Sequence, residues 1–154
     1  MASGVYVFPD KAKLNFFSAT DLLAATAANF REALVTSAYI PANATDEVWA
    51  DVSANEIAAG NGYTAGGAAM SAVTLTQTAG VVKFTAAPTV WNATGGNIPA
   101  WRRSVIYYLG TLNGKINPLL GHFLGDSTPA DTPATSSGNP LTITHNASGI
   151  LAAT

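Results

Sequence analysis

Alternating hydrophobic and polar residues recur in short stretches from residue 69 to residue 153, and they predict β-strands. Between Val73 and Phe84 the alternation is interrupted by Ala79-Gly80, so we expect a hairpin that turns at this pair. Further strands are predicted at residues 89–93, 104–109, 119–124, 141–145 and 150–153, each bounded by Gly, Pro or Asn. Many short strands at such spacing are typical of an antiparallel β-sandwich or jelly roll.

The first 52 residues have a less regular pattern. Two short extended pieces flank Pro9-Asp10, a turn-forming pair, and indicate an N-terminal arm over about residues 1–17. Residues 20–35 combine helical spacing with β-forming residues, so we expect a helix in the first half of this stretch and a strand in the second. Thr45 precedes two acidic residues and resembles an N-cap, which predicts a short connecting helix through about Val52 that stays outside the core.

The length of 154 residues fits one domain with a core of its own. We therefore expect a single, mainly β domain over residues 1–154, with an antiparallel sandwich or jelly-roll-like architecture and one or two short helices. Residues 126–140 contain three prolines among small and polar residues, so they predict an exposed, extended loop that does not pack into a core. Such a loop either contacts a neighbouring molecule or is a plain surface excursion.

Charged residues are scarce: Asp, Glu, Lys and Arg make up 10% of the chain, against about 25% in an ordinary soluble domain. Either small polar residues cover the surface, or partner chains cover much of it. A net charge of -2 with seven scattered basic residues argues against nucleic-acid binding. The sequence has no cysteine, no signal-peptide pattern and no apolar run of roughly 20 residues, which predicts a cytoplasmically made protein that does not bind membranes.

The stretch "GNGYTAGG", which begins at Gly60, matches a dinucleotide-binding fingerprint in its glycine spacing. That fingerprint needs a preceding strand, a following helix and an acidic residue about 20 positions later. Thr-rich alternation follows instead, and after Glu56 the next acidic residue is Asp126. We therefore predict no cofactor and interpret the glycines as a turn that enters the hairpin, so that valine at Gly62 or Gly66 would damage folding.

Catalytic chemistry has few candidate residues. The two histidines, His122 and His145, fall on predicted strands, where partly buried and hydrogen-bonded histidines are the usual case, and no nucleophile motif accompanies them. Glu47 and Asp51 could share a helix face around Ca²⁺, but two carboxylates are far from the six to eight oxygens of such a site. The sequence therefore predicts neither an enzyme nor a metal site.

Residues that could contact a partner occur in three places. Trp101-Arg102-Arg103 could anchor an interface, because Trp and Arg are common hot spots, or it could be a strand start with solvated arginines and a tryptophan at the core rim. Trp49 and Trp91 are expected in the core, and an aromatic sugar-binding surface is the alternative for them. Together with the arm and the proline-containing loop, the candidate interface comprises Val5, Val7, Phe8, Trp101, Arg102, Arg103, Pro129 and Pro133.

Several segments taken in order resemble a family of small virion-associated proteins of tailed bacteriophages. They are "FREALVTSAYIP", "TDEVWADVSANEIAAGNGYTAGGAAM", "VVKFTAAPTVWNA", "RRSVIYYLG", "PLLGHFLG" and "LTITHNASGILAAT", and the most specific parts are "GYTAGGA" and "NASGIL". The resemblance covers most of the chain after about residue 30. It implies a location in the virion more firmly than a particular role.

The resemblance implies a non-enzymatic capsid decoration (cement) protein that binds the major capsid protein and neighbouring copies of itself, with a trimer as one arrangement. The expected location is the capsid surface. One alternative is a tail, baseplate or head-fibre component. Another is a carbohydrate-binding module for adsorption that uses exposed Trp or Tyr, although the sequence offers few paired aromatic residues on one predicted sheet face.

Overall fold

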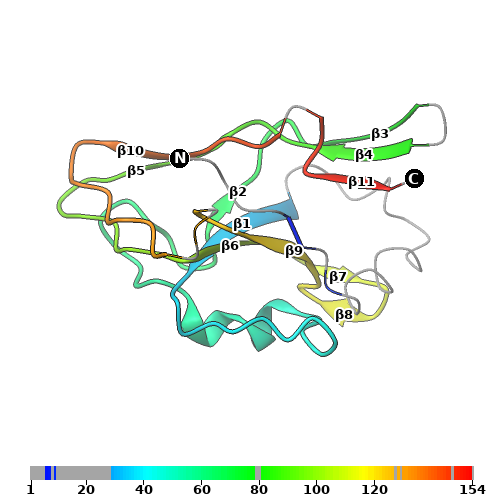
Figure 1. Cartoon of the computed structure of the whole chain (residues 1–154), viewed down its shortest axis with the longest axis horizontal. Helices are drawn as coiled ribbons and strands as arrows, with labels where there is room; N and C mark the ends of the chain where they lie inside the picture. Colours follow the sequence, from blue (N-terminus) through cyan, green and yellow to red (C-terminus); the bar gives the residue numbers. More distant parts are fainter. Residues whose placement is uncertain are drawn as a thin grey trace.

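The described part of the chain forms short antiparallel strands joined by turns and by the 3-10 helices η3 and η4 (Figure 1). The computed structural model describes residues 6, 7, 9, 29–78, 81–126, 128, 130–146 and 148–153. In chain order its strands are β1 (Phe30–Val35), β2 (Ala68–Ala69), β3 (Thr74–Thr78), β4 (Val81–Thr85), β5 (Thr89–Asn92), β6 (Arg103–Tyr108), β7 (Thr111–Leu112), β8 (Lys115–Ile116), β9 (Leu119–Leu124), β10 (Pro140–Ile143) and β11 (Leu151–Ala153). The 3-10 helices η3 (Trp49–Asp51) and η4 (Ser53–Asn55) lie between β1 and β2.

The described strands pair in four antiparallel sheets. The largest has the order β2-β1-β6-β9, and the others are β11-β4-β3, β10-β5 and β7-β8. In the largest sheet, β1 and β6 pair along all six residues of each strand. Gly121 of β9 lies opposite Ile106, whereas Leu119 lies opposite Tyr107, so Leu120 is an extra residue. This β-bulge shifts the alternation of side chains along β9.

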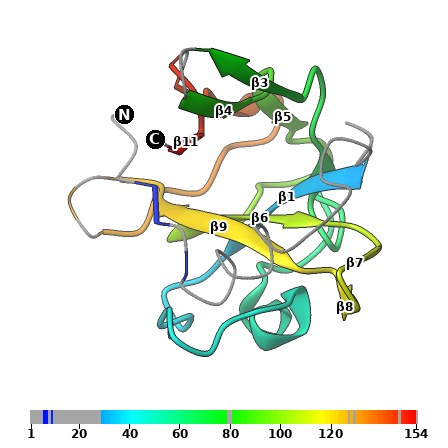
Figure 2. The same ribbon diagram turned by 90° about the vertical axis from the view of Figure 1, so that its right-hand side faces the viewer.

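The four-stranded sheet is buried on both faces and forms the middle layer of the molecule (Figure 2). Its strands β1, β6 and β9 consist almost entirely of buried residues, whereas burial alternates residue by residue along β5 and β10. A strand that is covered on both faces needs apolar side chains in consecutive positions. The runs "SVIYY" in β6 and "LLGHFL" in β9 meet that requirement.

A separate hydrophobic core lies on each face of this middle sheet. The core toward the β10-β5 and β11-β4-β3 sheets contains, among others, Phe30, Leu34, Phe84, Trp91, Ile106, Leu120, Phe123, Leu141, Ile143 and Ile150. The core toward the 3-10 helices consists of Ala33, Val35, Tyr39, Val52, Val105, Tyr107 and Leu119. Each fully buried large side chain stabilises the fold by about 1.5–3 kcal/mol, so both faces contribute to stability.

The predicted fold class is confirmed: the protein is mainly β with antiparallel sheets. The two strands of the predicted hairpin pair as β3 and β4, while its turn at Ala79-Gly80 lies outside the described residues. Strands occur at each of the five later predicted positions. The strand expected in the second half of residues 20–35 is β1, while the helix expected before it falls outside the described residues. The sandwich or jelly-roll arrangement is not confirmed, since the described strands divide among four sheets.

The expected helix at Thr45 begins later and has a different role. Asp46 lies outside the helix: its amide donates to the Ala42 carbonyl at 2.8 Å, and its carboxylate accepts hydrogen bonds from the Tyr39 hydroxyl at 2.6 Å and the Ala42 amide at 2.8 Å. Helix η3 begins only at Trp49. Val52, which follows it, is fully buried against the middle sheet. The prediction that this segment stays outside the core was therefore wrong.

The described residues of the loop at 126–140 are extended and mostly exposed, as predicted, but they are paired with the rest of the protein. Antiparallel bridges join Thr132 to Trp101 and Thr135 to Ile98. Thr132 is 2% exposed, so the expectation that no part of this loop packs inside was wrong for this residue. A small β-branched side chain can enter the core here because its backbone groups are paired with Trp101.

Candidate interaction surface

The part of the predicted N-terminal arm that the structure describes lies along the outer edge of β9. The Val7 amide donates to the His122 carbonyl at 2.8 Å, and the His122 amide donates back at 3.0 Å. Val7 thus occupies an edge where β9 has no further strand partner among the described residues. Val5 and Phe8 lie outside the described residues, and their part in an interface stays a prediction.

The structure brings Trp101 and Arg102 together with the proline-containing loop. Trp101 is only 4% exposed, which matches the alternative of a tryptophan packed at the core. The Arg102 side chain is partly exposed, and its Nε lies 2.7 Å from Oδ1 of Asp131 in the loop. Pro133 is exposed, and Pro129 lies outside the described residues. Pro133 and the Arg102–Asp131 pair are therefore the accessible members of this part of the candidate interface.

Arg103 faces away from that region and belongs to a polar cluster beside the second core. Burial lowers the pKa of Arg103, and the neighbouring Arg102 lowers it further, whereas the Tyr39 hydroxyl acts in the opposite direction. Tyr39 donates to Asp46, and burial is the main reason that its own pKa is raised. Arg103 is thus a half-buried residue of the fold.

His122 is the most deeply buried member of this polar cluster. It is 2% exposed, and its Nε2 lies 3.2 Å from the side-chain oxygen of Asn43. Its ring packs edge-on against the ring of Tyr39, with 6.1 Å between the two ring centroids. Burial is the main cause that lowers the pKa of His122 to about 4, and the positive charge of Arg103 adds to it. The ring is therefore neutral in the folded protein at pH 7, as a partly apolar site requires.

Acidification should destabilise the protein through His122. Its pKa falls from 6.5 to about 4 on folding, so the unfolded chain binds a proton in this range that the folded chain does not bind. The contribution of neutral His122 to the free energy of unfolding is then fully present above pH 6.5. It falls as the pH drops toward 4, and about 3 kcal/mol is lost at pH 4. Urea unfolding across this range measures the loss. His122→Gln should flatten the pH dependence; an equally steep curve for this variant would assign the loss to other groups.

A second polar network lies inside the larger core. Glu32 of β1 is fully buried on the same strand face as Phe30 and Leu34. Its Oε1 accepts a hydrogen bond from the Ser104 hydroxyl at 2.6 Å, and its Oε2 lies 3.3 Å from Nε2 of His145. Glu32 was not predicted from the sequence as a site residue, although a glutamate on the core face of a predicted strand was a visible signal.

The arrangement of Ser104, Glu32 and His145 does not fit nucleophilic catalysis. In a catalytic triad the histidine lies between the serine and the carboxylate, so that it takes the hydroxyl proton. Here the serine hydroxyl donates to the carboxylate itself, and Ser104 and Glu32 are both 0% exposed. His145 follows the end of β10 rather than lying on the strand, but both histidines are buried and hydrogen-bonded as predicted. This network connects the layers of the fold.

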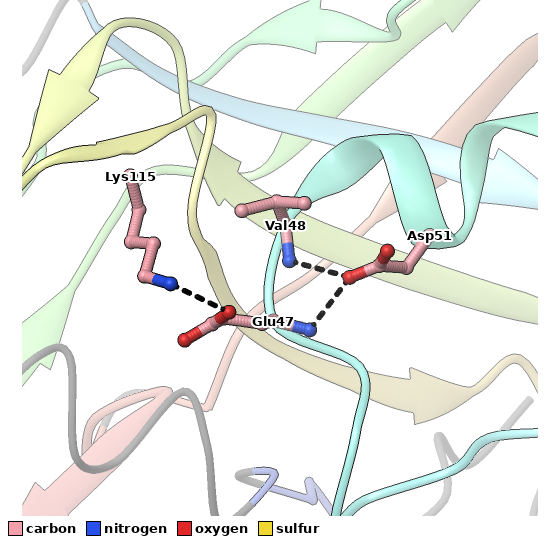
Figure 3. A network of polar contacts seen from close by, with 4 residues as sticks. All are labelled: Glu47, Val48, Asp51 and Lys115. Carbon is pink, nitrogen blue, oxygen red and sulfur yellow. Dashed lines mark hydrogen bonds and ion pairs between the residues drawn. The ribbon is translucent and has the colours of Figure 1, made fainter.

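The carboxylates of Glu47 and Asp51 are engaged with protein groups (Figure 3). Oδ2 of Asp51 accepts hydrogen bonds from the backbone amides of Glu47 at 2.9 Å and Val48 at 3.0 Å, which caps helix η3. Oε2 of Glu47 lies 2.9 Å from the Lys115 ammonium on β8. The two carboxylates therefore point to different partners, and one of them links the helical segment to the β7-β8 hairpin.

The glycine-containing stretch forms a turn that side chains fasten to the middle sheet. The Glu56 carboxylate accepts hydrogen bonds from the Tyr63 hydroxyl at 2.8 Å and the Gly66 amide at 2.7 Å. The Tyr107 hydroxyl donates to the Gly66 carbonyl at 2.7 Å. Gly62 has φ +94°, in the left-handed region. The turn predicted from the sequence is confirmed, and the amides of Gly60, Tyr63, Gly66 and Gly67 donate to protein acceptors.

Four large apolar side chains are exposed among the described residues: Ile40 at 82%, Ile116 at 69%, Val90 at 47% and Leu109 at 41%. Ile116 lies on β8, at the periphery of the molecule (Figure 2). Single exposed apolar residues are common in proteins. Ile40 and Ile116, each more than two-thirds exposed, are nevertheless the most exposed large apolar side chains in the described part of the chain, and neither was predicted from the sequence as a contact residue.

Within the described residues there is no group of three or more His, Asp or Glu side chains placed to hold a metal ion. No helix in the described part of the chain is long and apolar enough to cross a membrane. No protein-family model, no curated protein and no solved structure matches this chain.

Proposed function

We propose that this chain is a non-enzymatic structural protein of bacteriophage virions that binds the outer surface of the head and stabilises the shell. The segment resemblance to virion-associated proteins motivates the virion location. Our proposed partners are the major capsid protein and neighbouring copies of this chain, with contacts made by shape and adhesion. A tail, baseplate or head-fibre position is the alternative within the same class.

The proposal rests on one observation: the side chains that could do chemistry are buried or hydrogen-bonded to other groups of the fold. His122 and His145 are buried with polar partners, and Glu32 is enclosed in the larger core. Glu56 fastens the glycine turn, and Asp51 caps a helix. These groups support the fold, while the exposed isoleucines and the exposed loop are available for adhesion.

A cement role demands little surface from each subunit. The chain has an accessible surface of 7476 Å², and a standard interface covers about 800 Å² on each partner, or roughly a tenth of it. On a symmetric shell, a subunit that touches several capsid proteins gains avidity because the second contact forms at high effective concentration. Moderate contacts are therefore sufficient.

The exposed isoleucines provide a test of adhesion. Ile116→Asp and Ile40→Asp place a charge at exposed apolar positions, so stability should change by no more than about 0.5 kcal/mol. If these residues contact the shell, at least one variant should bind about tenfold more weakly to heads assembled without this chain, measured by co-sedimentation. Thr76→Asp adds the same charge at an exposed polar site and serves as the control. Equal binding by all three variants would contradict adhesion through these residues.

The position in the particle is tested separately. Tails and DNA-filled heads can be purified apart and probed with an antibody against this chain. Signal on heads alone supports the decoration role, whereas signal on tails alone selects the alternative. Absence from both would overturn the virion assignment.

A further inference from the structure

Strand β3 has one open edge in the described part of the chain, which we call the β3 edge. The strand lies at the end of the β11-β4-β3 sheet and pairs only with β4. Both views place it at the outer margin of the molecule (Figure 1, Figure 2). The other long outer strand, β9, has its edge bridged by Val7. With five residues, β3 is therefore the longest described strand that has no partner along one edge.

The backbone groups on the β3 edge belong to Leu75 and Gln77. The Phe84 carbonyl of β4 accepts from the Ile150 amide at 2.8 Å, so the backbone groups of Phe84 point toward β11. Phe84 lies opposite Leu75, and the two residues are therefore a pair without mutual hydrogen bonds. The amide and carbonyl of Leu75 consequently point away from β4, and the alternation along a strand gives Gln77 the same direction.

The β3 edge lacks the features by which β-proteins usually keep other strands away. Outer strands are commonly protected by charged residues, a proline or a β-bulge. The sequence of β3, "TLTQT", contains no charge and no proline, and it pairs with β4 in continuous register along all five residues. Thr74 and Thr76 are exposed, and threonine favours strands. An additional strand can therefore extend this sheet through the backbone groups of Leu75 and Gln77.

We propose that the β3 edge pairs with the β3 edge of a second copy of this chain. An antiparallel strand related by a two-fold axis through Thr76 places Leu75 opposite Gln77 of the other copy, and the two such pairs exchange four hydrogen bonds. Thr76 then faces its own equivalent, and opposed threonines are a favourable cross-strand pair. Lys83 is the only charged residue of the three strands. It lies three strand spacings from its equivalent, about 14 Å, so the repulsion between the two is largely screened.

This pairing supplies the contact between neighbouring copies, and it rests on that part of the proposed function. One strand-to-strand contact is smaller than a standard interface, so isolated chains should associate weakly, with a Kd of about 0.1–1 mM. Copies held side by side on a shell reach effective concentrations of about 1 mM. The pairing is then populated on the particle and scarce in dilute solution.

Amide hydrogen exchange of the isolated full-length chain tests the pairing. Between about 10 µM and about 1 mM chain, exchange at Leu75 and Gln77 should slow about two- to fivefold, the change that this Kd gives by mass action. Thr76 serves as the internal control, because its amide faces β4 and is protected at both concentrations. Sedimentation should show the mean mass rising from that of one chain toward that of two. Constant exchange at Leu75 and Gln77 would overturn the proposal.

Thr76→Glu tests the register. The new carboxylate lies opposite Lys83 of its own chain, which supports the fold, but the carboxylates of two copies would meet at the two-fold axis. The variant should therefore lose the concentration dependence of exchange. Val90→Glu on β5 adds the same charge at an exposed site outside the β11-β4-β3 sheet and should keep that dependence. An equal dependence in both variants would show that the copies do not pair at Thr76.

Binding to heads separates this inference from the proposed function. Copies on sparsely occupied heads do not touch, so Thr76→Glu, like the Thr76→Asp control, should bind such heads as the unmodified chain does. Chains that bind heads but do not pair would overturn this inference alone, whereas chains that pair but do not bind heads would overturn the proposed function. Protection of Leu75 and Gln77 only when heads are present would assign the β3 edge to a strand of another protein, against the proposed pairing.

Discussion

Gly62→Ala is expected to unfold the protein or to reduce its stability by more than about 4 kcal/mol, an exceptional loss for one methyl group. A Cβ at this position would overlap the carbonyl oxygen of Asn92 and would lie 2.9 Å from its carbonyl carbon. Those atoms belong to the backbone of β5, so they cannot move aside as the end of a flexible side chain could. Gly62 also has φ +94°, which a residue with a side chain adopts only with strain.

Gly138→Ala separates the two effects in Gly62→Ala. Gly138 has φ +88°, close to that of Gly62, but a Cβ there meets nothing within 4 Å. This control should therefore lose only the conformational term of about 1–2 kcal/mol. Thermal or urea unfolding of the two variants gives the comparison. If both lose the same amount, the close approach of Gly62 to β5 has no energetic weight.

The strands were predictable because they depend on local patterns. β3 and β4 alternate in polarity, and β9 is bounded by Pro118 and Gly125. The division into four sheets was not predictable, because it depends on pairing between distant segments. Leu120 illustrates this: the extra residue that forms the bulge looks like any other leucine in "LLGHFL", and only the pairing of β9 with β6 identifies it.

The candidate site was harder to predict than the strands. Trp101 and Arg102 were identified by residue type, and the structure gives them different roles because consecutive side chains face opposite sides of a strand. Whether Trp101 faced the core could not be decided without Thr132, its bridge partner 31 positions later in the chain. Thr45, followed by two acidic residues, resembled a helix N-cap in sequence, but helix η3 begins only at Trp49 and the Asp46 carboxylate accepts hydrogen bonds from Tyr39 and Ala42. These contacts overrode the local propensity.

His145→Leu is expected to reduce stability by about 1–3 kcal/mol or more, the usual cost of depriving a buried polar group of a close polar neighbour. The variant would leave the Glu32 carboxyl group fully buried, with the Ser104 hydroxyl as its hydrogen-bond partner among the described residues. His145 lies in the segment that leads from β10 to β11, so the loss should also increase hydrogen exchange at Leu151–Ala153. Urea unfolding and amide exchange measure the two effects.

Replacing the whole network should restore the stability that His145→Leu removes. The triple variant Glu32→Leu, Ser104→Ala, His145→Leu leaves none of the three polar groups in the core, and well-packed apolar replacements of a buried pair are often neutral or stabilising by 1–4 kcal/mol. We therefore expect it to equal or exceed the original chain in stability. A double-mutant cycle between Glu32→Leu and His145→Leu should give a coupling of about 0.5–3 kcal/mol. A coupling of zero would show that Glu32 and His145 contribute independently to stability. The contact between them would then not be what stabilises the buried Glu32 side chain.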